Sequence, residues 1–408
     1  MFYILIAIFS ITTLLHPLQA QDSKDQNWQA KAQSSFLNLL KSHSKQNLSQ
    51  FRVQLWTVSP GKSVTTAFGH AALRIVSGPD YGDTDFYLDF GVYDPSPGFL
   101  WRFMKGEANF FVNIIPTSSA FQTWDSTGRG ILVSELLLDE SKKHKLFEEI
   151  LKVYEKNKDG YYYDNFTNNC VTFLRDILSE TKGEKIRLLS MDSEKNTWRK
   201  RVLPYSQSII WLNINETLLF DKDTDAVRDS YEIIYLPEDL RRAVIDSGLS
   251  EESKVILRDR WGIQPGTSSA LWKIIFAIII LFSLPVPLFK LFERYAVVTY
   301  SLVSGIGGTV ATLVYFFTSF SFMDQTISWL IYSPLDFLLL KRYDLWQNKR
   351  AFWSYVALRC LMLLFAFSLR LSIYKQDIDM ILFVSVFFFA MLLFKYRNDV
   401  ISLIKRQS

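Results

Sequence analysis

Residues 68–75 read FGHAALRI and residues 161–176 read YYYDNFTNNCVTFLRD, and these two stretches decide what kind of domain the chain forms. In the first, Gly69 lets the backbone turn closely before a β-like run and aims the imidazole of His70. In the second, a polar loop ends at Cys170, which opens an apparent helix. A helix N-terminus and a nearby imidazolium both favour the thiolate form of a cysteine. We therefore predict Cys170 as a nucleophile and His70 as its base.

Both residues also have a structural explanation. A lone cysteine is often a small buried apolar residue, and a lone histidine is often a core residue that bonds to the backbone. Cys170 and His70 lie far apart in the sequence, so their meeting depends on the fold. The polar approach to Cys170 and its lack of a pairing cysteine favour the functional role.

The sequence around these stretches predicts an α+β domain. Residues 53–58, 71–76 and 86–90 form short β-like runs, and residues 141–154 have helical periodicity. We assign residues 51–180 to a catalytic α+β domain. A polar helical segment with an apolar stripe precedes it at 21–50, and an accessory extracytoplasmic region follows at 181–268.

The N-terminus predicts export. Residues 1–20 are mostly apolar, and small residues at a plausible cleavage site precede a polar segment, as in a secretory signal peptide. The stretch has no basic side chain before its apolar part, so an uncleaved anchor is the alternative. Either form exports the domain that follows.

The C-terminal part predicts an α-helical transmembrane bundle. Residues 269–396 contain about five apolar stretches, and a helix of about 20 apolar residues spans a bilayer. The basic residues gather in alternate loops and in the tail at 397–408, which places that tail in the cytoplasm. The stretches are residues 271–292, 296–320, 326–340, 352–371 and 379–395.

Charged residues inside these stretches need partners, because a charge that faces lipid is costly. Arg359 is expected either to pair with Asp336 or to meet a lipid phosphate. Arg370 lies near the end of its stretch and is expected to be structural.

Composition excludes several classes of protein. The 408 residues carry a formal net charge of +4 without a continuous basic stripe, so nucleic acid is not an expected partner. The chain has two cysteines, of which Cys360 lies in an apolar stretch, so we expect no disulfide framework. The four histidines form no metal-ligand pattern, and we expect neither a metal nor a cofactor.

Several stretches resemble the periplasmic domain of the Lnb-type lipoprotein N-acyltransferases. They are the two quoted above, LDFGVYD at 88–94, and shorter ones at 99–106 and 235–237. The resemblance covers about residues 50–240. It implies a fold related to permuted papain/NlpC-like and lecithin retinol acyltransferase-like domains, in which a histidine strand precedes the nucleophile helix. In such folds a polar residue on the next strand orients the histidine, and Asp89 matches it most closely; Asp94 and Asn169 are secondary candidates.

The resemblance also implies a reaction. Cys170 would take an acyl chain from a phospholipid as a thioester and pass it to the N-terminal amine of a diacylated lipoprotein. The enzyme would lie in the bacterial inner membrane as a multi-pass protein, with its catalytic domain in the periplasm.

Three alternatives remain open from the sequence. A cysteine peptidase that acts on peptidoglycan would use the same residue pair, although five spans exceed what it needs. A phospholipase or thioesterase would differ only in using water to resolve the thioester. A receptor or assembly module would not need Cys170 at all.

Overall fold

The computed structural model describes residues 23–77, 84–94, 96–189, 196–207, 209–263, 265–266, 290–341, 349–372, 376–399 and 401. The chain forms two compact units. Unit 1 contains residues up to 196 together with 228–265, and unit 2 contains residues 197–227 and 266–408. Each unit is described by itself. The predicted signal at 1–20 lies outside the described residues.

Unit 1 is built on a seven-stranded sheet with the order β6-β4-β3-β2-β1-β5-β7. All of its neighbouring strands are antiparallel. The three strands predicted from the sequence correspond to β1, β2 and β3. The strands are β1 Arg52–Val58, β2 His70–Val76, β3 Asp85–Tyr93, β4 Asn109–Pro116, β5 Ile131–Glu135, β6 Tyr161–Tyr162 and β7 Lys254–Leu257.

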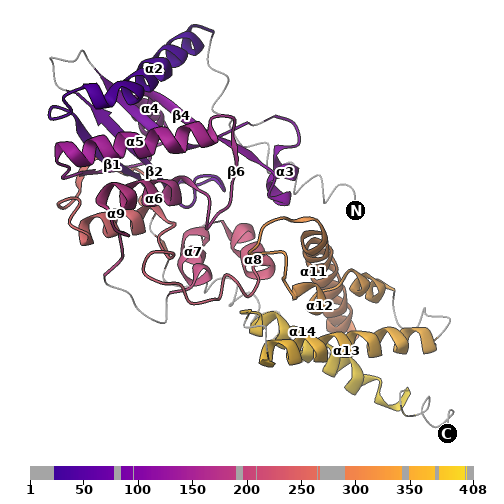
Figure 1. The fold of residues 1–408 in the computed structure, drawn as a ribbon. Coiled ribbons are helices and arrows are strands. Elements are labelled where there is room, and N and C mark those ends of the chain that lie inside the picture. Colours follow the sequence, from indigo (N-terminus) through magenta and orange to yellow (C-terminus); the bar gives the residue numbers. More distant parts are fainter. Residues whose placement is uncertain are drawn as a thin grey trace. The chain divides into compact units, whose positions relative to one another are not determined.

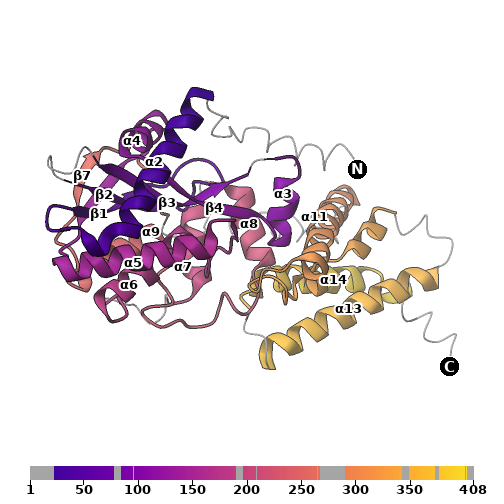
Figure 2. The ribbon, with the colours of Figure 1, turned by 45° about the horizontal axis from the view of Figure 1, so that its top comes forward.

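Helices cover both faces of this sheet, because side chains on a strand alternate between its faces. Tyr87 of β3 packs with the helix α4, whereas its neighbour Phe86 contacts Phe36 of α2. Phe90, on the same face as Phe86, stacks on Phe173 of α6. Figures 1 and 2 show α5 beside α6. The helices of unit 1 are α2 Ser23–Ser42, α3 Phe99–Lys105, α4 Thr117–Ser126, α5 Glu140–Asn157, α6 Cys170–Lys182 and α9 Pro237–Asp246, with a 3₁₀ turn η2 at His43–Lys45.

Unit 1 therefore has the mixed α/β architecture that the sequence predicts. It is larger than the predicted domain at 51–180, since α2 packs against β4 and α5, and β7 extends the sheet beside β5. The predicted accessory region at 181–268 is not one body. Residues 197–227 belong to unit 2, and residues 228–265 return to unit 1.

Unit 2 is helical. It contains α7 Trp198–Ser206, α8 Ile210–Leu219, α11 Lys290–Phe317, α12 Ser328–Ile331, the 3₁₀ helix η5 Pro334–Leu340, α13 Lys349–Ser372 and α14 Asp379–Lys395. Tyr295–Phe317 and Lys349–Leu371 are long and apolar enough to cross a membrane, and only 39% and 33% of their most apolar windows are buried. Large apolar side chains on their surfaces are what helices that face lipid require.

These two helices match the predicted stretches 296–320 and 352–371. The stretch 326–340 is divided between α12 and η5, and α14 is apolar but has 17 residues. Residues 271–289 of the first stretch and most of the tail at 397–408 lie outside the described residues. The number of spans stays a prediction.

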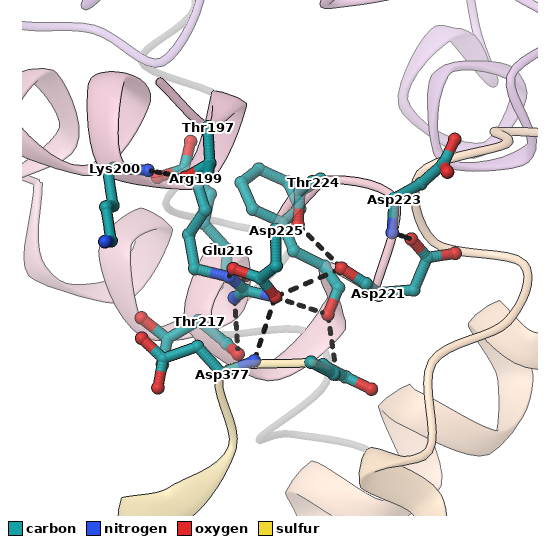
Figure 3. A network of polar contacts seen from close by, with 12 residues as sticks. Thr197, Arg199, Lys200, Glu216, Thr217, Asp221, Asp223, Thr224, Asp225 and Asp377 are labelled. Carbon is teal, nitrogen blue, oxygen red and sulfur yellow. Dashed lines mark hydrogen bonds and ion pairs between the residues drawn. The ribbon is translucent and has the colours of Figure 1, made fainter. Parts of the chain in front are cut away.

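Buried polar networks explain why residues 197–227 belong to unit 2. Arg199 is 1% exposed and donates to both carboxylate oxygens of Asp225, at 2.8 and 3.0 Å (Figure 3). Asp225 also accepts from the backbone N–H of Asp377, and the Gln376 amide donates to the Phe220 carbonyl. These contacts fix α7 and α8 to the segment that precedes α14.

A second network lies among the apolar helices. Arg359 Nε lies 2.7 Å from Asp336 Oδ1, and neither side chain is exposed. Of the two predicted roles of Arg359, the structure shows the pairing. Arg370 pairs with Asp379 at 2.9 Å, in line with a structural role.

Candidate active site

His70 and Asp89 lie on neighbouring strands at one end of the sheet. β2 and β3 pair with Leu73 opposite Leu88, so the continued register sets Asp89 one diagonal position from His70. The Nε2 atom of His70 lies 2.7 Å from Asp89 Oδ1, and the two side chains are 12% and 11% exposed. The structure thus brings together the histidine and the carboxylate predicted from the sequence.

Two glycines make room for this pair. Gly69 has φ +81°, and a Cβ there would lie 2.8 Å from the Val58 carbonyl oxygen. A Cβ on Gly91 would lie 2.8 Å from His70 Cε1. Any side chain at either position would therefore move the histidine strand or its ring. Gly69 was expected to aim His70 from the sequence, but Gly91 was not, because its role depends on strand register.

Cys170 occupies the first position of α6. The Asn169 side chain caps this helix by accepting from the N–H groups of Val171 and Thr172, and the Thr172 hydroxyl accepts from the Asn169 N–H. Cys170 interacts electrostatically with His70, as Asp89 does. Because Asp89 occupies Nε2, Nδ1 is the ring nitrogen that remains for the thiol. The three predicted residues therefore form one row, from Asp89 through His70 to Cys170.

The charges in this row favour a protonated histidine. Burial alone would lower the pKa of His70, but the negative charges of Asp89 and Cys170 and the hydrogen bond to Asp89 raise it to about 10. A cysteine beside an imidazolium at a helix N-terminus is in the environment that activates thiols for nucleophilic attack. The row therefore provides the environment of a nucleophilic cysteine next to its base.

Three further residues surround the row, and the sequence did not indicate them. The Trp124 ring lies 5.6 Å from the His70 ring, and its N–H donates to the Tyr87 hydroxyl. The Arg129 guanidinium lies 4.8 Å from the Trp124 ring centroid and donates to the Ser59 carbonyl, while its Nη2 has no partner within the part of the chain that the structure describes. Burial lowers the pKa of Arg129 to about 10, against the opposing negative charges of Tyr87 and Cys170.

Neither of the two secondary candidates has a hydrogen bond to His70 among the contacts of the described residues. Asn169 is 4% exposed and serves as the helix cap described above. Asp94 accepts from the backbone N–H of Ser96 in a turn. Within the described ranges, no group of three or more His, Cys, Asp or Glu residues has the arrangement of a metal site.

Residues 41–203 match the family model described as the Lnb N-terminal periplasmic domain. The match contains His70, Asp89 and Cys170 and confirms the resemblance inferred from the sequence. The family suggests an enzyme, and together with the two apolar helices of unit 2 it fits a membrane protein with a periplasmic domain. No curated protein and no solved structure matches the chain.

Proposed function

We propose that this chain, whose residues 41–203 match the Lnb N-terminal periplasmic domain, is a lipoprotein N-acyltransferase with Cys170 as its nucleophile. The acyl donor is a phospholipid, and the acceptor is the N-terminal amine of a diacylated lipoprotein. The observation that carries the proposal is the row of Asp89, His70 and Cys170 at the start of α6, inside the Lnb domain.

The first half-reaction forms a thioester. His70 Nδ1 holds the proton of the Cys170 thiol, and the thiolate attacks the carbonyl carbon of the donor ester. A C–S bond forms and the C–O bond breaks. The departing alkoxide takes the proton from His70 and leaves as a lysophospholipid.

The second half-reaction forms an amide. The lipoprotein amine attacks the thioester carbonyl, and His70 accepts the proton that the amine loses. A C–N bond forms and the C–S bond breaks, which returns Cys170 to its thiolate form. Asp89 keeps His70 oriented through both steps, and the reaction needs no redox partner.

The N-terminus of α6 supports the tetrahedral intermediates. Asn169 engages the N–H groups of Val171 and Thr172, which leaves the Cys170 N–H as the first-turn donor that this cap does not use. This N–H lies next to the reacting sulfur, where an oxyanion develops. One such donor is worth about 2.7–4 kcal/mol in related reactions.

The order of the elements supports a permuted papain/NlpC-like arrangement. The strand that carries His70 precedes the helix that carries Cys170, and α6 packs against β2 and β3. We propose that unit 2 holds this domain at the periplasmic face of the inner membrane as a multi-pass anchor. Both proposed substrates reside in that bilayer.

The test is mass spectrometry of a lipoprotein N-terminal peptide from cells that depend on this protein. We expect wild type to yield the triacylated peptide and Cys170→Ala to yield the diacylated one. Cys360→Ala is the matched control, because Cys360 is the other of the two cysteines, and it should keep the triacylated product.

Other outcomes would sink the proposal. Equal acylation in wild type and Cys170→Ala would exclude Cys170 as the transferring residue. Release of free fatty acid without N-acylation would indicate a phospholipase or thioesterase, and cleaved peptidoglycan would indicate a peptidase.

A further inference from the structure

The helix α3 presents large apolar side chains at the surface of unit 1. Trp101 is 48% exposed and Met104 is 41% exposed. The two are three residues apart, so they lie on one face of the helix. Arg102 and Lys105 lie in the last turn of this helix. Lys105 pairs with Glu107 at 2.6 Å, whereas Arg102 donates to the Pro97 carbonyl and the Ser96 hydroxyl, so Arg102 places a positive charge beside this face. We call Trp101 and Met104 the α3 face.

Behind the α3 face, the buried side of the helix joins an aromatic cluster. Phe99 is 8% exposed and stacks on Tyr93. Phe103 lies 6.0 Å from Tyr163, ring centroid to ring centroid, and Tyr163 stacks on Phe110 at 4.4 Å. Figure 1 shows α3 near the edge of the sheet formed by β4 and β6.

This cluster reaches the nucleophile. Tyr161 and Tyr163 open the loop that ends at Cys170, and the Tyr161 ring contacts Phe173 in the first turn of α6. Phe173 lies three residues after Cys170 in the same helix, so this ring contact brings the cluster to the first turn of α6. Aromatic side chains therefore connect the buried side of α3 with the first turn of α6, the helix that begins at Cys170.

We propose that the α3 face is a membrane-docking surface, which enters the headgroup region of a phospholipid bilayer and brings the donor ester to Cys170. Delivery of a phospholipid ester to Cys170 rests on the proposed function. Tryptophan favours the boundary between headgroups and acyl chains, and basic side chains beside it attract lipid phosphates.

The size of the face favours a lipid surface over a protein partner. A helix of seven residues is about 10 Å long at a rise of ~1.5 Å per residue. A stable protein interface covers about 800 Å² on each partner, far more than such a helix offers. Insertion into a bilayer needs no such area, because a few apolar side chains suffice at the interface.

Spin-label measurements on the full chain in lipid nanodiscs test the docking directly. The labels are attached to Trp101→Cys and, as control, to Trp261→Cys, both in a background in which Cys170 and Cys360 are serine. Trp261 is also 48% exposed and belongs to unit 1. We expect the label at position 101 to be accessible to dissolved oxygen and shielded from a water-soluble nickel chelate, and the label at 261 to show the reverse. Equal exposure of both labels to the nickel chelate would overturn the proposal.

A second measurement connects docking with chemistry through the amount of acyl-Cys170. Trp101→Glu should reduce acylation from bilayer phospholipid by about tenfold, the effect of losing one large apolar contact. Acylation from a short-chain phospholipid that is monomeric in water should change less than about twofold. Leu137→Glu is the control, since Leu137 is 51% exposed elsewhere in unit 1.

The outcomes separate this proposal from the proposed function. An equal loss with both donors in Trp101→Glu would mean a folding defect and would contradict docking. If wild type forms no acyl-Cys170 with either donor, the proposed function fails, while the spin labels still decide whether the α3 face enters the bilayer.

Discussion

Two buried ion pairs, His70–Asp89 in unit 1 and Arg359–Asp336 in unit 2, have the same separation and different surroundings. The N···O distance is 2.7 Å in each. The side chains of the first pair are 12% and 11% exposed, whereas those of the second are fully buried. The same contact therefore occurs once with solvent access and once without it.

The partners of each pair explain the difference. Asp336 also accepts from Ser304 and Tyr355, and Arg359 donates to the carbonyls of Leu330 and Ile331. Every contact in that group closes the irregular backbone of α12 and η5 against its neighbours, as non-helical backbone among apolar helices requires.

His70, in contrast, interacts electrostatically with Cys170 as well as with Asp89. This second neighbour is a nucleophile and not another structural partner. A fully buried pair with all its hydrogen bonds made therefore holds the fold, whereas a pair beside a partly exposed thiol is suited to chemistry.

Loss of the Arg359–Asp336 pair should destabilise the protein more than any other change considered below. Arg359→Met leaves Asp336 charged and buried, and we expect it to lower the free energy of unfolding by about 3–5 kcal/mol. Asp336→Leu combined with Arg359→Met removes both charges and should recover most of that loss. Denaturant unfolding in detergent micelles measures both variants against wild type.

The matched change in unit 1 is His70→Gln, whose amide can still donate to Asp89. We expect it to abolish acyl transfer and to change the free energy of unfolding far less than Arg359→Met does. A stable, active His70→Gln variant would contradict the chemical role of this pair. If the double variant of Asp336 and Arg359 were as unstable as Arg359→Met, the structural role of the Arg359–Asp336 pair would be contradicted.

The second prediction concerns pH. Because the pKa of His70 is raised to about 10 from an unfolded value of 6.5, its protonation stabilises the folded state. That contribution is complete below pH 6.5 and is lost as the pH rises through about 10. Asp89→Asn removes a negative charge that raises the pKa of His70, so this pKa should fall. The difference in the free energy of unfolding between Asp89→Asn and wild type should then narrow at high pH.

NMR titration of ¹³C-labelled histidine checks this prediction, since the chain has four histidines and His70→Gln identifies one signal. Wild type should show one histidine that titrates far above the others, and Asp89→Asn should bring it down by more than one pH unit. Titration of His70 below pH 7 in wild type would show that the row does not hold an imidazolium at neutral pH.

Local patterns predicted much of unit 1. The β-like runs correspond to β1, β2 and β3, and the polar loop before an apolar run correctly placed Cys170 at the start of a helix. These features depend on residues close together in the chain, which periodicity and helix-start signals report. Asp89 was found through the family resemblance, since its contact with His70 depends on the pairing of two strands.

Features that depend on distant contacts could not be predicted. Trp124 and Arg129 come from α4 and the turn after it, and no local pattern relates them to His70. Residues 197–227 have ordinary globular composition, and their place in unit 2 follows from Arg199, Asp225 and Asp377, which are far apart in the sequence. Such a network becomes visible only once the fold brings its members together.

The smallest expected effect concerns the helix cap that positions Cys170. Asn169→Ala leaves the N–H groups of Val171 and Thr172 without their acceptor, whereas Asn169→Ser keeps an oxygen that can cap the helix. Both variants lose the bonds from the Asn169 amide to the carbonyls of Asn165 and Tyr235, so the difference between them reports the cap alone. We expect Asn169→Ala to be less stable than Asn169→Ser by about 1 kcal/mol and to react more slowly with iodoacetamide at Cys170. Equal stability and equal alkylation rates in the two variants would mean that the cap does not set the position of the thiol. The contrast between unit 1 and the Arg359–Asp336 pair of unit 2 would then depend on His70 and Asp89 alone.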